Sequence, residues 1–201
     1  MSRINSICVY CASGPGTKPI FAQSARVFGR LLAENRIKLV YGGGSMGLMG
    51  ELAKTVLDHG GFVTGIIPDF LVNREHMMER AQERIVTRDM HERKRLMFER
   101  ADAFVALPGG VGTLEELVEQ LTWAQLGRHK KPILIANIDG FWDPLCMLLD
   151  QMRKVEFIRA GLTVEPLVVD RVEDILPKLL EAAHAVPELA KEMAPAAAEK
   201  M

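Results

Sequence analysis

The chain has 201 residues, of which 48% are hydrophobic and 25% are charged, and its formal net charge is −1. This length suits one domain with a sizeable core, and the composition is that of an ordinary globular protein. The near-neutral charge gives no electrostatic case for binding nucleic acid or a membrane surface, and no apolar run has the length of a membrane span. Because the N-terminal residues lack the pattern of a signal peptide, we expect a cytoplasmic protein.

Short apolar runs alternate with helical patterns along the chain. The runs predict strands over residues 7–10, 38–41, 62–67, 84–87, 103–107, 132–138 and 167–169. Helices are expected over residues 19–34, 48–58, 89–100, 114–127, 141–154 and 172–185. Strands that alternate with helices form a parallel sheet covered on both faces. We therefore expect one Rossmann-like, doubly wound α/β domain over residues 1–186 and a loose tail over 187–201.

Three of the expected strands run into a glycine-rich turn that is followed by a helix. The turns follow Tyr10, Tyr41 and Leu107, and in an open α/β sheet such turns gather at the carboxyl edge, where ligands bind. Glycines let a ligand approach the backbone, and the unpaired amides at a helix start suit a phosphate. Three converging loops therefore predict a phosphate-bearing ligand.

The third turn, residues 107–116, contains Thr113 and Glu116, whose spacing has two interpretations. Thr-x-x-Glu is the pattern of a capping box, in which Thr113 caps a helix starting near Leu114 and Glu116 bonds back to the cap. Spacing alone favours this capping interpretation. A role in a binding site stays open, because a capping glutamate also stands beside whatever the loop binds.

The second turn fits two known motifs. Residues 42–47 read Gly-x-Gly-x-x-Gly and Asp69 lies about twenty residues further on, which matches the dinucleotide fingerprint. That fingerprint usually occupies the first strand–helix turn, so we favour a nucleotide or phosphate loop over an NAD site. Residues 43–47 also read Gly-x-Ser-x-Gly, the nucleophile elbow of serine hydrolases, but no later histidine has a recognisable setting. We interpret Ser45 as a helix N-cap or a loop donor.

The helix expected over residues 89–100 carries two adjacent cations. Met90, Met97 and Ala101 form its apolar seam, and Arg93 and Lys94 flank this seam. Unpaired charges at a packed face are costly, so both cations need an anion. The pattern leaves open whether that anion is a protein carboxylate or a bound phosphate.

Two further patterns concern metals and assembly. Cys8 and Cys11 lie three apart in an expected strand and face opposite sides of the sheet, which favours two structural cysteines over a redox or zinc pair. No other residues have metal-ligand spacing, so no metal site is expected. Trp123 falls on the helix face opposite Leu117 and Leu121, which suggests that a second surface covers this helix and predicts a homodimer.

Taken together, these motifs resemble the "lonely guy" family of cytokinin-activating phosphoribohydrolases, from about residue 7 to residue 180. The match includes Glu-Arg-Lys at residues 92–94, Pro-Gly-Gly-Val-Gly-Thr-Leu-Glu-Glu at residues 108–116 and Thr-Trp-Ala-Gln-Leu-Gly at residues 122–127. The resemblance implies hydrolysis of the N-glycosidic bond in an N6-substituted adenosine 5′-monophosphate. The products would be a free base and ribose 5-phosphate, and no cofactor would be needed.

The resemblance also implies roles for particular residues. Arg93 and Glu116 match the catalytic pair, and we expect Glu116→Gln and Arg93→Ala to fold but to lose turnover. The expected substrate contacts are Ser13, Gly43, Gly44, Glu75, Met90, Lys94, Gly110, Val111, Gly112, Thr113, Leu114, Glu115 and Thr122. The alternative is a non-catalytic nucleotide-binding module on the same fold. A lysine decarboxylase finds no support, because nothing marks a Schiff-base lysine.

Overall fold

The computed structural model describes residues 4–158 and 165–192. Its centre is one seven-stranded sheet with the strand order β4-β3-β2-β1-β5-β6-β7, in which every pair of neighbours is parallel. The strands are β1 (Ser6–Tyr10), β2 (Lys38–Tyr41), β3 (Val63–Pro68), β4 (Glu83–Thr87), β5 (Ala103–Ala106), β6 (Ile133–Ala136) and β7 (Leu167–Val169). The predicted doubly wound α/β fold is confirmed.

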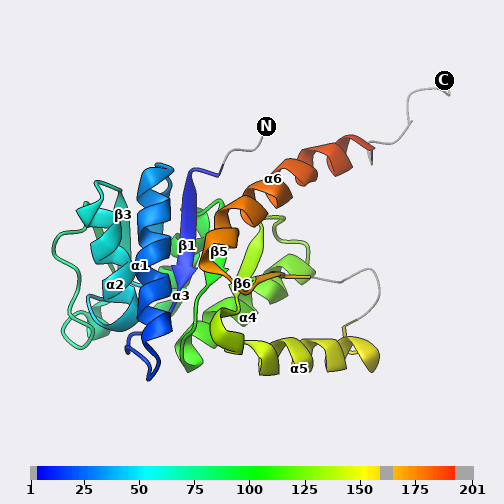
Figure 1. Ribbon diagram of the computed structural model, residues 1–201, viewed down its shortest axis with the longest axis horizontal. Coiled ribbons are helices and arrows are strands. Elements are labelled where there is room, and N and C mark those ends of the chain that lie inside the picture. The colour runs from blue at the N-terminus through cyan, green and yellow to red at the C-terminus, as the bar shows by residue number, and fades with distance from the viewer. Residues whose placement is uncertain (1–3, 159–164, 193–201) are drawn as a thin grey trace.

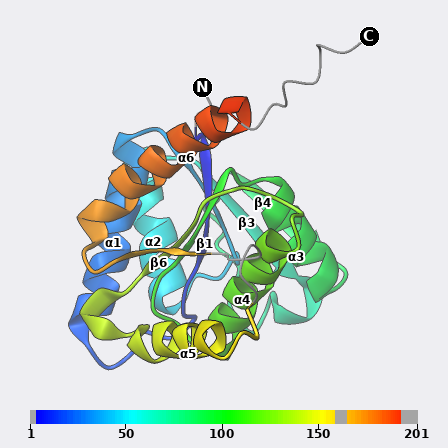
Figure 2. The ribbon, with the colours of Figure 1, turned by 90° about the vertical axis from the view of Figure 1, so that its right-hand side faces the viewer.

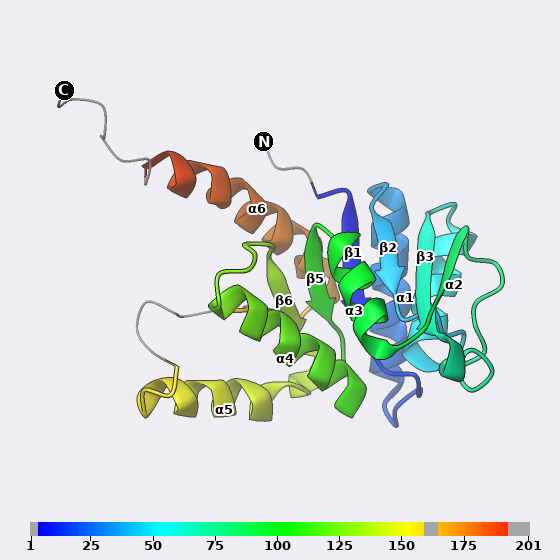
Figure 3. The same ribbon diagram turned by 180° about the vertical axis from the view of Figure 1, so that it is seen from behind.

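Helices cover both faces of this sheet (Figure 1). One face carries α1 (Pro19–Glu34), α2 (Gly47–Asp58) and α6 (Ile175–Glu192). The other face, seen from behind in Figure 3, carries α3 (Met90–Glu99) and α4 (Val111–Gln125). Below α4 in that view lies α5 (Asp143–Lys154), which Figure 2 shows nearly end-on. Among the described residues, no helix is both long and apolar enough to cross a bilayer.

The sheet separates two hydrophobic cores. Cys11 packs in the core beneath α1, α2 and α6, whereas Cys8 packs in the core beneath α3 and α4. Both thiols are free and buried, as expected for cysteines that face opposite sides of the sheet. The strands β1 and β5 in the middle are buried along their whole length, because helices shield both of their faces.

Most element bounds follow the sequence pattern. The helix at residues 19–34 has the expected ends, with Pro19 in its first turn, where a missing amide hydrogen is harmless. The last helix runs on to Glu192, beyond its expected end at residue 185, and so takes in part of the segment expected as a tail. The rest of that segment, residues 193–201, lies outside the described residues.

The strand order creates a switch point between β1 and β5. From β1 the chain builds outward through β2, β3 and β4 on one side, and from β5 it builds through β6 and β7 on the other. The loops that leave β1 and β5 therefore turn to opposite sides and open a crevice at the carboxyl edge. The glycine turns predicted to converge do so at this edge.

Candidate active site

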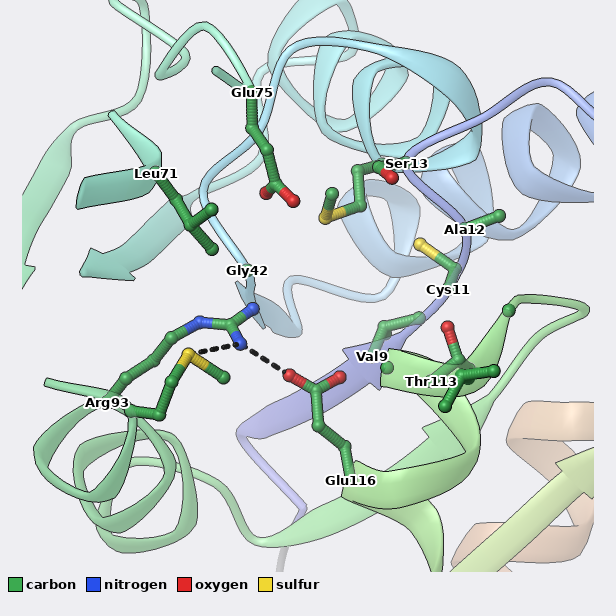
Figure 4. Close-up of a pocket in the computed structure, with 15 residues that line it drawn as sticks. Val9, Cys11, Ala12, Ser13, Gly42, Leu71, Glu75, Arg93, Thr113 and Glu116 are labelled. Carbon is green, nitrogen blue, oxygen red and sulfur yellow. Dashed lines mark hydrogen bonds and ion pairs between the residues drawn. The ribbon is translucent and has the colours of Figure 1, made fainter. Parts of the chain in front are cut away.

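A pocket of about 300 Å³ lies at the switch point (Figure 4). Its walls come from the loops after β1, β2, β3 and β5 and from the first turns of α3 and α4. The lining residues are Val9, Cys11, Ala12, Ser13, Gly42, Met49, Leu71, Glu75, Met90, Arg93, Gly110, Val111, Gly112, Thr113 and Glu116. Both residues of the expected catalytic pair are among them.

Arg93 and Glu116 form an ion pair in the wall of this pocket (Figure 4). Nη1 of Arg93 donates to Oε1 of Glu116 at 2.7 Å, and the two side chains are only 8% and 9% exposed. Nε of Arg93 also donates to the carbonyl oxygen of Ile66 in β3, at 3.1 Å. The guanidinium is thus fixed by two elements, and such a charge-assisted bond in a dry wall holds the carboxylate in one orientation.

Gly42 makes room for this arginine. A Cβ atom at position 42 would stand 2.4 Å from Nη2 of Arg93, closer than any side chain tolerates. Nη2 makes no hydrogen bond to the described residues and lies next to Gly42, which lines the pocket. The arginine therefore has a donor left for a ligand.

Burial and the ion pair act in opposite directions on Glu116. Burial raises the pKa of its carboxyl group above the ordinary value, and Arg93 counters this by favouring the carboxylate. Glu115 and Glu75 add smaller raising effects on the pKa of Glu116. A buried carboxylate that is paired with a cation, as Glu116 is with Arg93, can stabilise positive charge that develops on a bound molecule.

The capping interpretation of Glu116 is wrong. The helix α4 begins at Val111 rather than near Leu114, its N-cap is Gly110, and no side chain caps it. Thr113 therefore lies inside the first turn, and Glu116 bonds to Arg93 across the pocket wall. Glycine is an acceptable N-cap, but it leaves no side-chain signal in the sequence.

The uncapped start of α4 faces the pocket. Gly110, Val111, Gly112 and Thr113 all line the pocket, and the first amides of a helix have no acceptor within the helix. With no acidic residue in this first turn, the partial positive charge at the helix start is not neutralised. This end of the pocket suits an anion, and a phosphate above all.

The second glycine turn serves packing and support. A Cβ atom at Gly47 would lie 2.3 Å from the carbonyl oxygen of Ser13, so glycine here lets the first and second loops touch. Ser45 is exposed and is not the N-cap of α2, which is Met46, but its backbone amide donates to the carbonyl oxygen of Glu75 at 3.1 Å. This geometry explains the turn without a dinucleotide or a serine nucleophile.

Gly43 and Gly44 hold the loop that carries Glu75. The carbonyl oxygen of Gly43 accepts from the amide of Met78 at 2.9 Å, and Gly44 forms an isolated bridge with Met77. Neither glycine lines the pocket. Their expected role as direct substrate contacts stays a prediction, beside the supporting role that these backbone contacts give them.

Four other expected contacts lie outside the pocket: Lys94, Leu114, Glu115 and Thr122. Nζ of Lys94 pairs with Glu115 at 2.5 Å and with Glu119 at 3.0 Å. Each of the two cations of α3 is therefore paired with its own protein carboxylates. Thr122 is on the exposed side of α4, where its hydroxyl donates to the carbonyl oxygen of Val118 at 2.8 Å. The sequence did not single out Met49 or Leu71 as lining residues, whereas Gly42 begins the turn predicted as a nucleotide or phosphate loop.

Trp123 is covered by its own chain. Its ring packs edge-to-face on Phe98 with centroids 5.2 Å apart, and the guanidinium of Arg128 lies 4.4 Å from the ring centre. Trp123 is therefore half-buried without a partner chain. Contacts within the chain thus cover part of Trp123, and the homodimer inferred from it stays a prediction.

The fold and the pocket define a Rossmann-like α/β protein with a phosphate-compatible site at its switch point. The family described as "Possible lysine decarboxylase" matches residues 49–179. Yet no lysine lines the pocket in the part of the chain that the structure describes. The curated relatives carry a different name and give the more specific assignment.

The rice (Oryza sativa subsp. japonica) protein "Probable cytokinin riboside 5'-monophosphate phosphoribohydrolase LOG4" is 47% identical over 180 residues, which cover 90% of this chain and 78% of that protein. The Arabidopsis thaliana protein "Cytokinin riboside 5'-monophosphate phosphoribohydrolase LOG7" is 48% identical over 157 residues, covering 78% of this chain and 72% of the relative. The chain belongs to this family, the "lonely guy" phosphoribohydrolases.

Solved structures support the fold at lower identity. The molybdenum cofactor binding protein from Rippkaea orientalis superposes with a TM-score of 0.65 at 22% identity, covering 90% of this chain and 98% of that chain. A molybdenum cofactor carrier protein from Chlamydomonas reinhardtii gives a TM-score of 0.64 at 22% identity, over 90% of this chain and 99% of the other. At this identity the likeness concerns the fold alone.

Proposed function

We infer that this protein hydrolyses the N-glycosidic bond of N6-substituted adenosine 5′-monophosphates and releases the free cytokinin base and ribose 5-phosphate. The relatives' names supply the reaction, and the buried Arg93–Glu116 pair beside an uncapped helix start is the observation that carries it to this chain. The pair lines the pocket, so it stands where a bound nucleotide would lie.

The two ends of the pocket orient the nucleotide. The amides of residues 110–113 receive the phosphate, as a helix start favours an anion. The ribose then lies over Glu116, and the base extends toward Leu71 and Glu75 at the other end (Figure 4), where Met49 also lies. Thioether and aliphatic side chains at that end suit a flat, largely apolar ring.

Glu116 is the group that meets the reacting carbon. Breaking a ribosyl C–N bond builds positive charge on the sugar, as in glycoside hydrolysis generally. A fixed carboxylate at this carbon stabilises that charge, orients the attacking water and takes up its proton. Arg93 positions Glu116 and favours its ionised form, while Nη2 of Arg93 remains available to the phosphate or ribose.

The test of this function is to incubate the protein with AMP and with N6-isopentenyl-AMP and to follow base release by chromatography. Faster release from the isopentenyl substrate supports cytokinin activation. Release from AMP alone contradicts that part and indicates nucleotide salvage. Tight binding without release from either nucleotide overturns the enzyme and leaves a nucleotide-binding module.

We also propose that the protein is a cytoplasmic homodimer. No side chain of α5 is buried, and Met147 and Leu148 are 71% and 51% exposed. Val118 and Leu126 on the neighbouring α4 are exposed as well, so apolar side chains from both helices remain uncovered. A second copy on this face would also place Thr122 against another chain, which accounts for an expected substrate contact that lies outside its own pocket.

The proposed cytoplasmic location rests on the cysteines. All three are free thiols, which suits the reducing cytoplasm.

A further inference from the structure

A second set of ion pairs joins α3 and α4 beside the Arg93–Glu116 pair. Nζ of Lys94, on α3, lies 2.5 Å from Oε1 of Glu115 and 3.0 Å from Oε1 of Glu119, both on α4. Lys94 and Glu115 are sequence neighbours of Arg93 and Glu116, which reach toward each other from the same two helices in Figure 4. The two cations of α3 therefore bind carboxylates of α4 side by side.

The Lys94 side chain is held at this joint between the helices. It is only 11% exposed, and it does not line the pocket. Glu119 is 22% exposed, and its second carboxylate oxygen is buried without a hydrogen-bond partner among the described residues. The charge of Glu119 is therefore offset by Lys94, and removing one partner of such a pair leaves the other charge without compensation.

The Arg93–Glu116 bond depends on how α4 lies against α3. Nε of Arg93 donates to the carbonyl oxygen of Ile66, so the guanidinium is fixed to the sheet, whereas Glu116 moves with α4. About one helical turn further along α3, Phe98 packs edge-to-face on Trp123 of α4. A hydrogen bond of 2.7 Å tolerates little displacement of either helix. Lys94 links the helices at the end where this bond is made.

The charges around Glu116 give Lys94 a second effect. Burial is the main cause of the raised pKa of Glu116, Arg93 opposes it, and the negative charge of Glu115 raises this pKa further. Because Lys94 binds Glu115, it offsets that charge. The other titratable groups that face Glu116 are Glu75 from the loop after β3 and the buried Cys8, Tyr10 and Cys11 of β1.

We propose that Lys94 is a positioning residue for the hydrolysis rather than a contact of the substrate, an inference that rests on the proposed hydrolase function. It ties α3 to α4 through two carboxylates, which keeps Arg93 and Glu116 at bonding distance. It also neutralises the carboxylate of Glu115 next to the reacting group. Lys94 acts from outside the pocket, so its removal affects turnover more than substrate binding.

The experiment compares Lys94→Met and Lys94→Arg with the wild type on N6-isopentenyl-AMP. Methionine has a similar length but no charge, so kcat should fall about tenfold to a hundredfold through misplacement of the pair, with little change in KM. Arginine can still bind the carboxylates and should restore most of the rate. Arg95→Met is the matched control, since Arg95 is on the same helix but pairs with Glu99 within α3, at 3.1 Å. It should behave as the wild type.

The pH profile separates this role from a loss of stability. In Lys94→Met the acidic limb of kcat/KM should move to higher pH, because Glu115 is no longer neutralised and favours the protonated form of Glu116. Glu115→Gln should move the limb to lower pH, since glutamine still accepts from Lys94 but carries no charge. This variant leaves no buried charge unpaired, so it tests the proposal even where Lys94→Met fails to fold. Glu119→Gln also keeps an acceptor for Lys94, and its rate at neutral pH should be that of the wild type.

The outcomes distinguish the possible roles of Lys94. A raised KM with unchanged kcat in Lys94→Met would overturn the proposal and indicate a direct contact with the substrate. An acidic limb that stays in place in Lys94→Met, with a lower free energy of unfolding, would overturn it in favour of a purely structural pair. So would an unmoved limb in Glu115→Gln. Absence of base release by the wild type would instead remove the proposed function itself.

Discussion

Arg93 is a residue whose removal should affect both stability and turnover. Arg93→Ala leaves Glu116 buried without its cation, so we expect the free energy of unfolding to fall by about 3 kcal/mol. This refines the expectation from sequence that the variant folds as the wild type does. Adding Glu116→Gln to Arg93→Ala removes the unpaired charge and should recover part of the loss, which urea denaturation of both variants measures. No recovery in the double variant would show that the pair is not coupled.

The pKa of Glu116 sets the expected pH dependence. Burial raises this pKa in the folded state, so the folded chain keeps the proton to a higher pH than the unfolded chain does. The stabilising contribution of the protonated group is complete below the unfolded value of about 4.3 and is lost as the pH rises through the folded pKa. Turnover needs the carboxylate and should rise over this same window.

This dependence is checked by measuring kcat/KM against pH, with circular dichroism to confirm that the protein stays folded. We expect the acidic limb to have its midpoint above about 4.3. A midpoint at or below that value would contradict a raised pKa for Glu116.

At the scale of elements, the loops after β1 and β2 depend on their contact at Gly47. This residue has a φ of +56° and a Cβ atom there would meet the backbone of Ser13. Gly47→Ala should therefore lower the free energy of unfolding by about 2 kcal/mol, through backbone strain and separation of the loops. Gly14→Ala is the control, because nothing lies within 4 Å of its Cβ position. Thermal unfolding measures both, and equal stabilities would contradict the packing role.

The elements show where the sequence is informative. Periodic apolar runs predicted every strand of the sheet and the order of the helices. A strand buried on both faces gives a continuous apolar run, and a helix buried on one face gives apolar residues at helical spacing. The start of α4 was missed, since its glycine N-cap carries no side-chain signature and Thr113 mimics a cap. The contacts of Trp123 with Phe98 and Arg128 were not foreseen, because helix periodicity does not show which residues outside the helix pack on it.

Those residues of the site that belong to short sequence motifs could be predicted from the sequence. The glycine turn and the Arg93–Glu116 pair were identified from their motifs and from the family resemblance, and they meet in one pocket. The contribution of Leu71 and Met49 depends on how loops from different strands approach one another. No periodicity records such an approach, so these residues could only be found in three dimensions.

At the scale of the whole molecule, the uncovered face of α4 and α5 predicts a dimer. Replacing exposed apolar residues on this face with lysine, as in Leu126→Lys combined with Met147→Lys, should shift the mass in solution to that of a monomer. Lys54→Glu on α2 is the control, since Lys54 is exposed on the other side of the sheet. Light scattering after size-exclusion chromatography measures the mass. A monomeric wild type at micromolar concentration would remove the proposal.

The central claim is that this pocket cleaves a nucleotide with Glu116 at the reacting carbon. The most direct measurement follows both products from N6-isopentenyl-AMP with the wild type, Glu116→Gln and the control Glu119→Gln, whose side chain lies outside the pocket. We expect equal amounts of free base and ribose 5-phosphate from the wild type and the control, and at least about a hundredfold slower release from Glu116→Gln. Near-normal release from Glu116→Gln, or none from the wild type, would contradict the account.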